Sequence, residues 1–213
     1  MPRTKSMAAP APTFEIELSY RGVVAGIDEA GRGPWAGPVV AAAVILDPDN
    51  CPEGLADSKT IPEKRRDEIA RAIRATSIVG VGAASVEEID AINILQATFL
   101  AMARAEAALS KKPAVCIVDG SMKPKLRAQT RMVVKGDALS LSIAAASIIA
   151  KTARDAIMRE LALVHPEYAW ERNKGYGAPA HREALDRHGV TPHHRRSFAP
   201  IHNILCGGLQ KAS

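Results

Sequence analysis

The sequence lacks most features that mark secreted, membrane or metal-finger proteins. Its 213 residues include three cysteines, which lie far apart without a CxxC pair and so exclude a disulfide scaffold and a cysteine-rich zinc site. No apolar run approaches the roughly 18 residues that a membrane span requires. Residues 1–13 lack the apolar stretch of a signal peptide. We therefore expect a cytoplasmic protein with no membrane partner.

The glycine-rich segments do not match the common nucleotide-binding motifs. The chain has no GxxxxGK[ST] sequence, which excludes a P-loop. The segment GRGPWAG at 31–37 has the spacing GxGxxxG and follows acidic residues, which a dinucleotide site does not require. The segment GVGAAS at 80–85 ends in Ser85, and Glu87 and Glu88 follow where a phosphate would lie. Both mismatches disfavour a Rossmann site.

The charge of the chain is uneven along its length. The 28 Lys and Arg residues exceed the 23 Asp and Glu residues, which gives a net charge of +5. Residues 1–120 carry 13 basic and 16 acidic residues, whereas residues 121–213 carry 15 and 7. A basic second half suits a polyanion such as nucleic acid, and a solvated basic surface is the ordinary alternative.

The alternation of apolar strands and amphipathic helices predicts an α/β fold with a central sheet. Continuous β-branched and small apolar runs predict strands at 23–28, 39–46, 77–85, 114–120 and 132–137. Apolar spacing and alanine content predict helices at 62–76, 86–110, 139–164 and 179–188. We divide the chain into a flexible tail, a core and a C-terminal extension, at 1–19, 20–165 and 166–213.

Acidic residues end three of the predicted strands. Asp28 and Glu29 follow the first strand, while Asp119 and Asp137 end two later ones. Carboxylates that converge at strand ends repel one another, and divalent cations relieve that repulsion. Oxygen ligands favour Mg²⁺ or Mn²⁺ over Zn²⁺, and two such ions cleave phosphodiesters. The alternative is that each acid caps an element, with Asp137 capping the helix near Leu139.

Two further segments have residue types that bind nucleic acid. Gly31, Arg32 and Gly33 form a turn in which the backbone can approach a phosphate and the arginine can bind it, although a tight turn alone explains the glycines. Lys174 and Tyr176 lie in the run NKGYG, where an exposed tyrosine can stack on a base or sugar. An ordinary surface loop with an incidental tyrosine is the alternative for that run.

Taken together, six segments resemble the motifs of bacterial ribonuclease HII in order and spacing, from about residue 20 to residue 200. They are GIDEAGRGPWAGPVVAAAVIL at 26–46, DSK at 57–59, IVDG at 117–120, KGDALSLSIAAASIIAKTARD at 135–155, NKGYGAPAH at 173–181 and HHRRSF at 193–198. The resemblance implies an RNase H-like α/β fold, with a central mixed sheet flanked by helices and a C-terminal helical and loop extension. It also implies an endonuclease that cleaves the RNA strand of RNA–DNA hybrids, including single ribonucleotides in duplex DNA. We expect the protein to be a monomer.

The resemblance also assigns roles to individual residues. It implies that two Mg²⁺ or Mn²⁺ ions are held by Asp28, Glu29, Asp119 and Asp137. The turn of Gly31, Arg32 and Gly33 would recognise the ribose 2′-OH and the phosphate at the RNA–DNA junction, and Tyr176 would stack on the next sugar. Ser58 and Lys59 would hold phosphates of the nucleic-acid backbone. From the basic segments near Tyr176 we also expect substrate contacts from Lys174, Arg195 and Arg196. Cleavage on the 5′ side of the ribonucleotide would leave 3′-OH and 5′-phosphate ends.

Some positions depart from the family pattern. Thr60 replaces a usual lysine and Ala178 a usual threonine, which affects phosphate binding rather than the acids. Only about 20 residues precede the first motif, unlike ribonuclease HIII with its additional N-terminal domain. Because adjacent strand residues face opposite sides, we expect the strand to end at Asp28 or Glu29 to act through its backbone carbonyl. A non-catalytic nucleic-acid-binding module and a different nuclease of this fold remain the competing interpretations.

Overall fold

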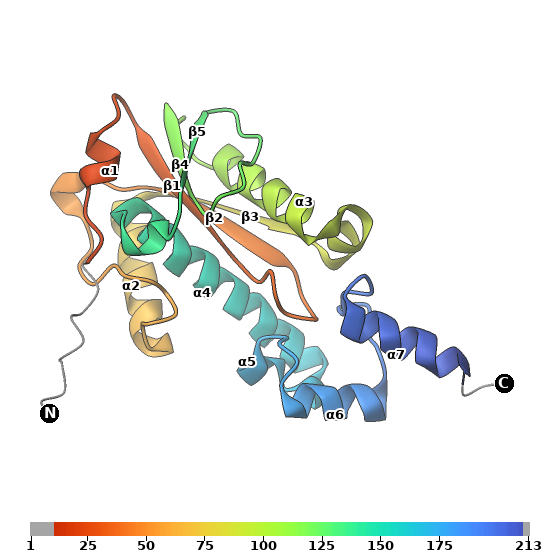
Figure 1. Ribbon diagram of the computed structural model, residues 1–213. Helices are drawn as coiled ribbons and strands as arrows, with labels where there is room; N and C mark the ends of the chain where they lie inside the picture. Colours follow the sequence, from red (N-terminus) through yellow and green to blue (C-terminus); the bar gives the residue numbers. More distant parts are fainter. Residues whose placement is uncertain (1–10, 211–213) are drawn as a thin grey trace, which may run out of the picture.

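A five-stranded mixed sheet lies at the centre of the computed structural model, which describes residues 11–210 (Figure 1). Its strands are β1 (Val24–Ala30), β2 (Val39–Ile45), β3 (Ile78–Ala84), β4 (Val115–Asp119) and β5 (Gln129–Val133), in the spatial order β3-β2-β1-β4-β5. The pairs β1–β2 and β2–β3 are antiparallel, whereas β1–β4 and β4–β5 are parallel. The predicted mixed α/β architecture is therefore confirmed.

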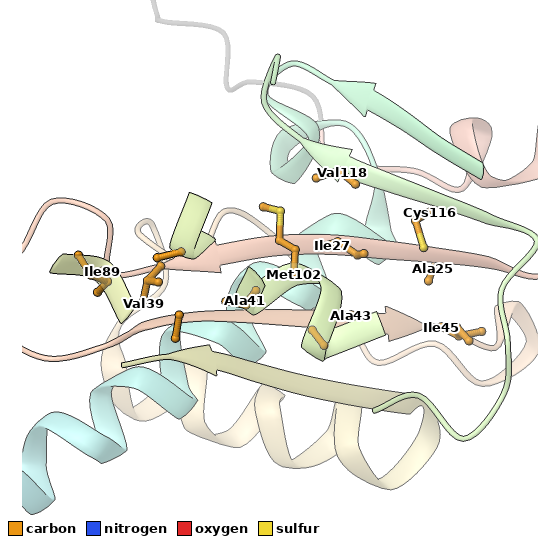
Figure 2. Packing of buried hydrophobic residues seen from close by; sticks show 14 residues of the cluster. Ala25, Ile27, Val39, Ala41, Ala43, Ile45, Ile89, Met102, Cys116 and Val118 are labelled. Carbon is orange, nitrogen blue, oxygen red and sulfur yellow. The ribbon is translucent and has the colours of Figure 1, made fainter. Parts of the chain in front are cut away.

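Helices cover both faces of the sheet. The helices are α1 (Glu15–Leu18), α2 (Glu63–Thr76), α3 (Val86–Ala107), α4 (Leu141–Val164), α5 (Trp170–Asn173), α6 (Pro179–His188) and α7 (Ala199–Gln210). On one face α3 packs against β1 and β2, where Met102 and Ile89 meet Ile27 and Val39 (Figure 2). The helices α2 and α4 cover the other face. No described helix is long and apolar enough to cross a membrane.

The small residues at the start of α4 bring this helix close to the central strand. At Gly26 in β1, an added Cβ would lie 2.1 Å from the carbonyl carbon of Ser142, so only glycine fits there. The next turns of the helix present Ala144, Ala145 and Ala146, all fully buried. This close approach places α4 directly beneath the end of β1 where the acids lie.

Two predictions about the secondary structure are wrong. The last strand occupies Gln129–Val133 rather than 132–137, because Lys135 adopts a φ of 57° and the chain turns into a 3₁₀ helix at Gly136–Ala138. Exposed Gln129 and Arg131 hide this strand from an apolar-run search. The C-terminal region, which we expected to be loops around one helix, also contains α5 and α7.

Part of the predicted flexible tail packs against the core. The backbone of Thr13 pairs with the segment before α4, since Thr13 N–H donates to Leu139 O at 3.1 Å. The buried Glu17 accepts hydrogen bonds through Oε1 from Ser140 Oγ at 2.7 Å and from Ser142 N–H at 2.8 Å. Residues 11–19 therefore support the start of α4, and residues 1–10 lie outside the described part of the chain.

The C-terminal region has a small core of its own. Tyr168 and Trp170 stack at 5.0 Å between ring centroids and are fully or almost fully buried, together with Met158 of α4 and Ile201 of α7. Ala36, from the loop between β1 and β2, belongs to the same cluster. This packing fixes the loop after β1 against the C-terminal region.

Candidate active site

Two of the predicted acids lie side by side at the ends of the central parallel strands. Because Ile27 of β1 pairs with Val118 of β4, Asp28 and Asp119 occupy the next position on both strands and face the α4 side. Asp28 Oδ1 accepts a hydrogen bond from Glu29 N–H at 2.7 Å, and Asp119 Oδ1 accepts one from Gly136 N–H at 2.7 Å. The strand register thus brings together carboxylates that are distant in the sequence.

The electrostatics of this cluster disfavour negative charge. Burial, then the neighbouring Glu29 and Asp119, raise the pKa of Asp28 well above its usual value, against an opposing hydrogen bond from Ser147. Burial also raises the pKa of Glu29, although Arg32 partly offsets the rise. The residues around Asp28 and Glu29 therefore stabilise the ionised forms of these carboxylates only in part.

The same acids affect the pKa of Lys59. Its partial burial lowers its pKa, but this effect is outweighed by the carboxylates of Asp57, Asp137, Asp28 and Asp119, so the pKa of Lys59 is raised. A single cation is thus stabilised by negative charge from four carboxylates, and the site is one that favours cations.

Glu29 lies on the opposite face from Asp28. The strand β1 continues to Ala30, so the expectation that it ends at Asp28 is wrong. The Glu29 side chain instead lines both the cleft of the acids and a smaller pocket against α3, and its Oε1 lies 3.4 Å from Arg32 Nη1. Glu29 can reach a ligand at the cleft only from the α3 side of the sheet.

Asp137 is near enough to Asp119 and Lys59 to interact with their charges. It belongs to the 3₁₀ turn after β5 and is not among the residues that line the cleft. Burial, followed by the charges of Asp119 and Asp57, raises its pKa. The alternative that Asp137 caps α4 is not supported, because Ser140 is the cap and its Oγ accepts a hydrogen bond from Ile143 N–H at 3.1 Å.

A cleft of about 460 Å³ joins the acids to most of the predicted substrate contacts. Its lining residues are Asp28, Glu29, Ala30, Gly31, Arg32, Gly33, Ser58, Lys59, Arg66, Asp119, Ser147, Lys151, Arg154 and Tyr176. Arg66, Ser147, Lys151 and Arg154 were not predicted. Three of these four, Ser147, Lys151 and Arg154, lie in the SIIAKTARD segment. Their spacing places them on one face of a helix, and this pattern could have identified them from the sequence.

The turn after β1 is held from below by a buried arginine. Arg195 is fully buried, and its guanidinium donates to the carbonyls of Gly37 at 2.8 Å, Arg32 at 2.9 Å, and Gly31 and Pro38 at 2.6 and 3.1 Å. The prediction that Arg195 contacts substrate is therefore corrected: its donors are already used inside the protein, and it positions the turn.

A second buried arginine supports the same region. Arg154 donates to Pro38 O at 3.1 Å, Ala36 O at 3.1 Å and Lys174 O at 2.9 Å. Gly31 has a φ of 96°, and an added Cβ there would lie 2.0 Å from Arg154 Nε, which makes glycine necessary at this position. Two guanidiniums thus fix the loop after β1 by binding its carbonyl oxygens.

Lys174 and Arg196, two further predicted basic contacts, do not line the cleft. Lys174 is buried, and its Nζ donates to Glu171 O at 2.6 Å and lies 3.4 Å from Glu63 Oε1, so the predicted phosphate contact is corrected to a structural one. Arg196 has an exposed side chain outside the lining of the cleft, while its backbone N–H donates to Asp90 at 2.9 Å.

Tyr176 is the exposed aromatic residue of the cleft. Its side chain is 51% exposed, and the edge of its ring lies 3.5 Å from where a Cβ of Gly33 would stand. Opposite, Ser58 Oγ and Ser147 Oγ are hydrogen-bonded at 2.9 Å beside Lys59. The cleft therefore combines acids, a glycine turn and an exposed ring, as a site for a nucleic-acid backbone requires.

The donor chemistry of the cleft fits divalent cations with a preference for oxygen ligands. In residues 11–210 no three Asp, Glu, His or Cys side chains are arranged as a ready metal cage. The adjacent carboxylates of Asp28 and Asp119, the first of them buried with a raised pKa, nevertheless form the pair that a cation would stabilise.

Comparison with known proteins gives a consistent result. Residues 25–201 match the family model of ribonuclease HII. Ribonuclease HII of Jannaschia sp. (strain CCS1) is 57% identical over 197 residues, which cover 92% of this chain and 99% of that protein. The crystal structure of ribonuclease H2 from Pyrococcus horikoshii OT3 is similar with a TM-score of 0.72 and 28% identity, over 85% of this chain and 96% of that one. Bst-RNase HIII in complex with Mn²⁺ shares the fold, with a TM-score of 0.70 and 21% identity over 88% and 70% of the two chains.

Proposed function

The chain belongs to the ribonuclease HII family, and from this premise we propose that its acidic cleft cleaves on the 5′ side of a ribonucleotide at RNA–DNA junctions. As a family member it is an endonuclease that hydrolyses the RNA of RNA–DNA hybrids. The proposal adds single ribonucleotides in duplex DNA as substrates and 3′-OH and 5′-phosphate ends as products. It also assigns Mg²⁺ or Mn²⁺ to the four acids Asp28, Glu29, Asp119 and Asp137.

The observation that carries the proposal is the pairing of Asp28 with Asp119 beside the glycine turn. These carboxylates would hold the cations, with Glu29 reaching them from the α3 side and Asp137 from the turn after β5. Divalent ions held by these residues would lower the pKa of a water molecule and would stabilise negative charge on the leaving 3′-oxygen. Because both functions belong to the ions, no side chain needs to act as a general base.

Selection for ribose would come from the turn held by Arg195. The 2′-OH is the group that separates a ribonucleotide from a deoxyribonucleotide at one position, and it requires a rigid polar partner. The carbonyls of Gly31 and Arg32 are fixed by Arg195, which keeps the peptide groups of the turn in one orientation beside the acids. Arg32, Ser58 and Lys59 would bind phosphates, and Tyr176 would stack on the following sugar.

We propose residues 166–213 as the extension that holds Tyr176 over the cleft, in a monomer that works in the cytoplasm. The separate small core around Trp170 supports this division. Light scattering of the purified protein at micromolar concentration should give one chain per particle. A dimer would contradict the monomer.

A cleavage assay on defined duplexes tests the function. The substrate is a labelled DNA duplex with one ribonucleotide, incubated with Mg²⁺, with Mn²⁺ or with EDTA, beside an all-DNA duplex. We expect metal-dependent cleavage at the 5′ side of the ribonucleotide and none in the all-DNA duplex. Cleavage of the all-DNA duplex would indicate a different nuclease of this fold. Binding without cleavage in any metal would favour the non-catalytic module.

A further inference from the structure

A chain of hydrogen bonds through two buried histidines ends on the backbone of Tyr176. His181 Nδ1 lies 2.9 Å from Tyr176 O, and His181 Nε2 lies 3.0 Å from His194 Nε2. His194 Nδ1 accepts a hydrogen bond from Thr191 N–H at 3.0 Å. Both imidazoles are fully buried. Such a pair is ordinarily part of the packed core, but here the donors and acceptors around the two rings also determine where their protons lie.

The neighbours of the pair permit one arrangement of protons. Because a backbone N–H donates to His194 Nδ1, the proton of His194 resides on Nε2. Because Tyr176 O can only accept, the proton of His181 resides on Nδ1, which leaves its Nε2 free to accept from His194. Trp170 Nε1–H donates to the same Nε2 at 3.2 Å. Every ring nitrogen is used, and both rings are neutral.

The far end of this chain is the residue that faces the cleft. Tyr176 is exposed, and it lies between Gly175, whose φ is 82°, and Gly177, where an added Cβ would lie 2.2 Å from the Trp35 ring. Flanking glycines give the backbone little stiffness of its own, so its orientation depends on outside contacts. The hydrogen bond from His181 is a side-chain contact of this kind, made to the carbonyl of the tyrosine itself.

We propose that His181 and His194 are positioning residues for Tyr176, which fix the angle at which its ring meets the nucleotide after the cleaved bond. The inference rests on the proposed function, because Tyr176 matters only if that nucleotide is bound. Thr191 orients His194, His194 orients His181, and His181 holds the carbonyl of Tyr176. Loss of a link leaves the ring present but less ordered.

A double-mutant cycle with Tyr176→Ala separates positioning from simple stability. The glutamine in His181→Gln reaches the position of Nε2 but not that of Nδ1, so it loses the bond to Tyr176 O. The asparagine in His181→Asn can restore that bond. We expect His181→Gln to lower kcat/KM about tenfold on the ribonucleotide duplex. This loss is smaller than the roughly 100-fold loss that a misplacement of about 1 Å can cause. His181→Asn should recover most of the loss.

In the Tyr176→Ala background, His181→Gln should change kcat/KM less than about twofold, because the positioned ring is gone. An equal loss in both backgrounds would overturn the inference, and so would wild-type kcat/KM for His181→Gln. His188→Gln on the exposed side of α6 is the matched control and should match wild type. If His181→Gln does not fold, His194→Leu takes its place in the cycle. Failure of wild type to cleave would overturn the proposed function together with this inference.

Discussion

The buried charged groups of two regions near the cleft differ in the partners that surround them. Asp28 is 6% exposed and lies beside the carboxylates of Glu29 and Asp119, which raise its pKa along with its burial. Arg195 is equally buried, but its guanidinium donates to four carbonyl oxygens. One region places like charges together, and the other satisfies its charged donors within the protein.

The difference indicates what each region contributes. A buried charge with inadequate partners costs stability, and such sites persist where a ligand supplies the missing charge. A buried charge with complete hydrogen bonding instead fixes local geometry. Asp28 therefore lies where a cation is expected, whereas Arg195 and the histidines determine where the turn and Tyr176 stand.

The largest expected effect follows from removing the charge of Asp28. Asp28→Asn should lower the cleavage rate at least about 1000-fold, comparable to losing a group that stabilises a transition state, while hybrid binding is largely retained. The same change should raise the free energy of unfolding in EDTA by about 1 kcal/mol or more, because it removes an ionised buried group. Steady-state kinetics and urea titration measure the two quantities.

Asp186→Asn, on the exposed side of α6, is the matched control and should alter neither quantity. A near-wild-type cleavage rate for Asp28→Asn would remove this residue from the site. A loss of stability would mean that the carboxylate is better satisfied than its neighbours suggest.

An intermediate effect is expected from replacing Arg195 by lysine, which has fewer N–H donors. Lysine has three N–H donors at one point and cannot reach the four carbonyls that the guanidinium binds. Arg195→Lys should therefore lower the free energy of unfolding by about 1–3 kcal/mol for each carbonyl left without a partner. It should also reduce discrimination between ribonucleotide and all-DNA duplexes. Arg196→Lys, at the adjacent exposed position, should match wild type in both measurements.

The smallest effect concerns pH. Burial lowers the pKa of His181, and burial together with neighbouring histidines lowers the pKa of His194 to about 3. Since the unfolded state binds protons near pH 6.5, stability is complete above that pH and falls as the pH drops towards 3. We expect His194 to cause a loss of about 1 kcal/mol for each pH unit below 6.5, and His181 to act in the same direction.

The acids act in the opposite direction, because their raised pKa values favour the folded state as the pH falls. The titration is therefore made in the Asp28→Asn background, in EDTA, by urea unfolding at pH 7.5, 6.5 and 5.5. A flat profile would show that the histidines are already charged or solvated in the folded protein.

Sequence reasoning was most successful for the acidic residues at the ends of apolar strands. Asp28 and Asp119 follow apolar runs that predicted buried strands, and the parallel pairing of β1 with β4 places them side by side. The resemblance of the motifs around them to those of ribonuclease HII predicted the mixed sheet. The strand predicted to end at Asp137 was misplaced, because the turn at Lys135 leaves no apolar signature.

The basic residues could not be assigned from sequence in the same way. Arg195 and Arg196 are adjacent, yet the first is fully buried beneath the turn and the second is exposed. Their difference arises from contacts with Gly31 and Asp90, which are more than 100 positions away along the chain. Local composition records charge, but burial is decided by tertiary packing.

The bond between Arg195 and Gly31 also joins positions 164 residues apart. On the ribosome, the strand that carries Asp28 is made early, but the residue that fixes the adjoining turn is among the last to emerge. A nascent chain that has exposed both Asp28 and Asp119 still lacks Arg195, which supports the turn after β1. The turn after β1 can therefore take its final conformation only when translation is nearly complete.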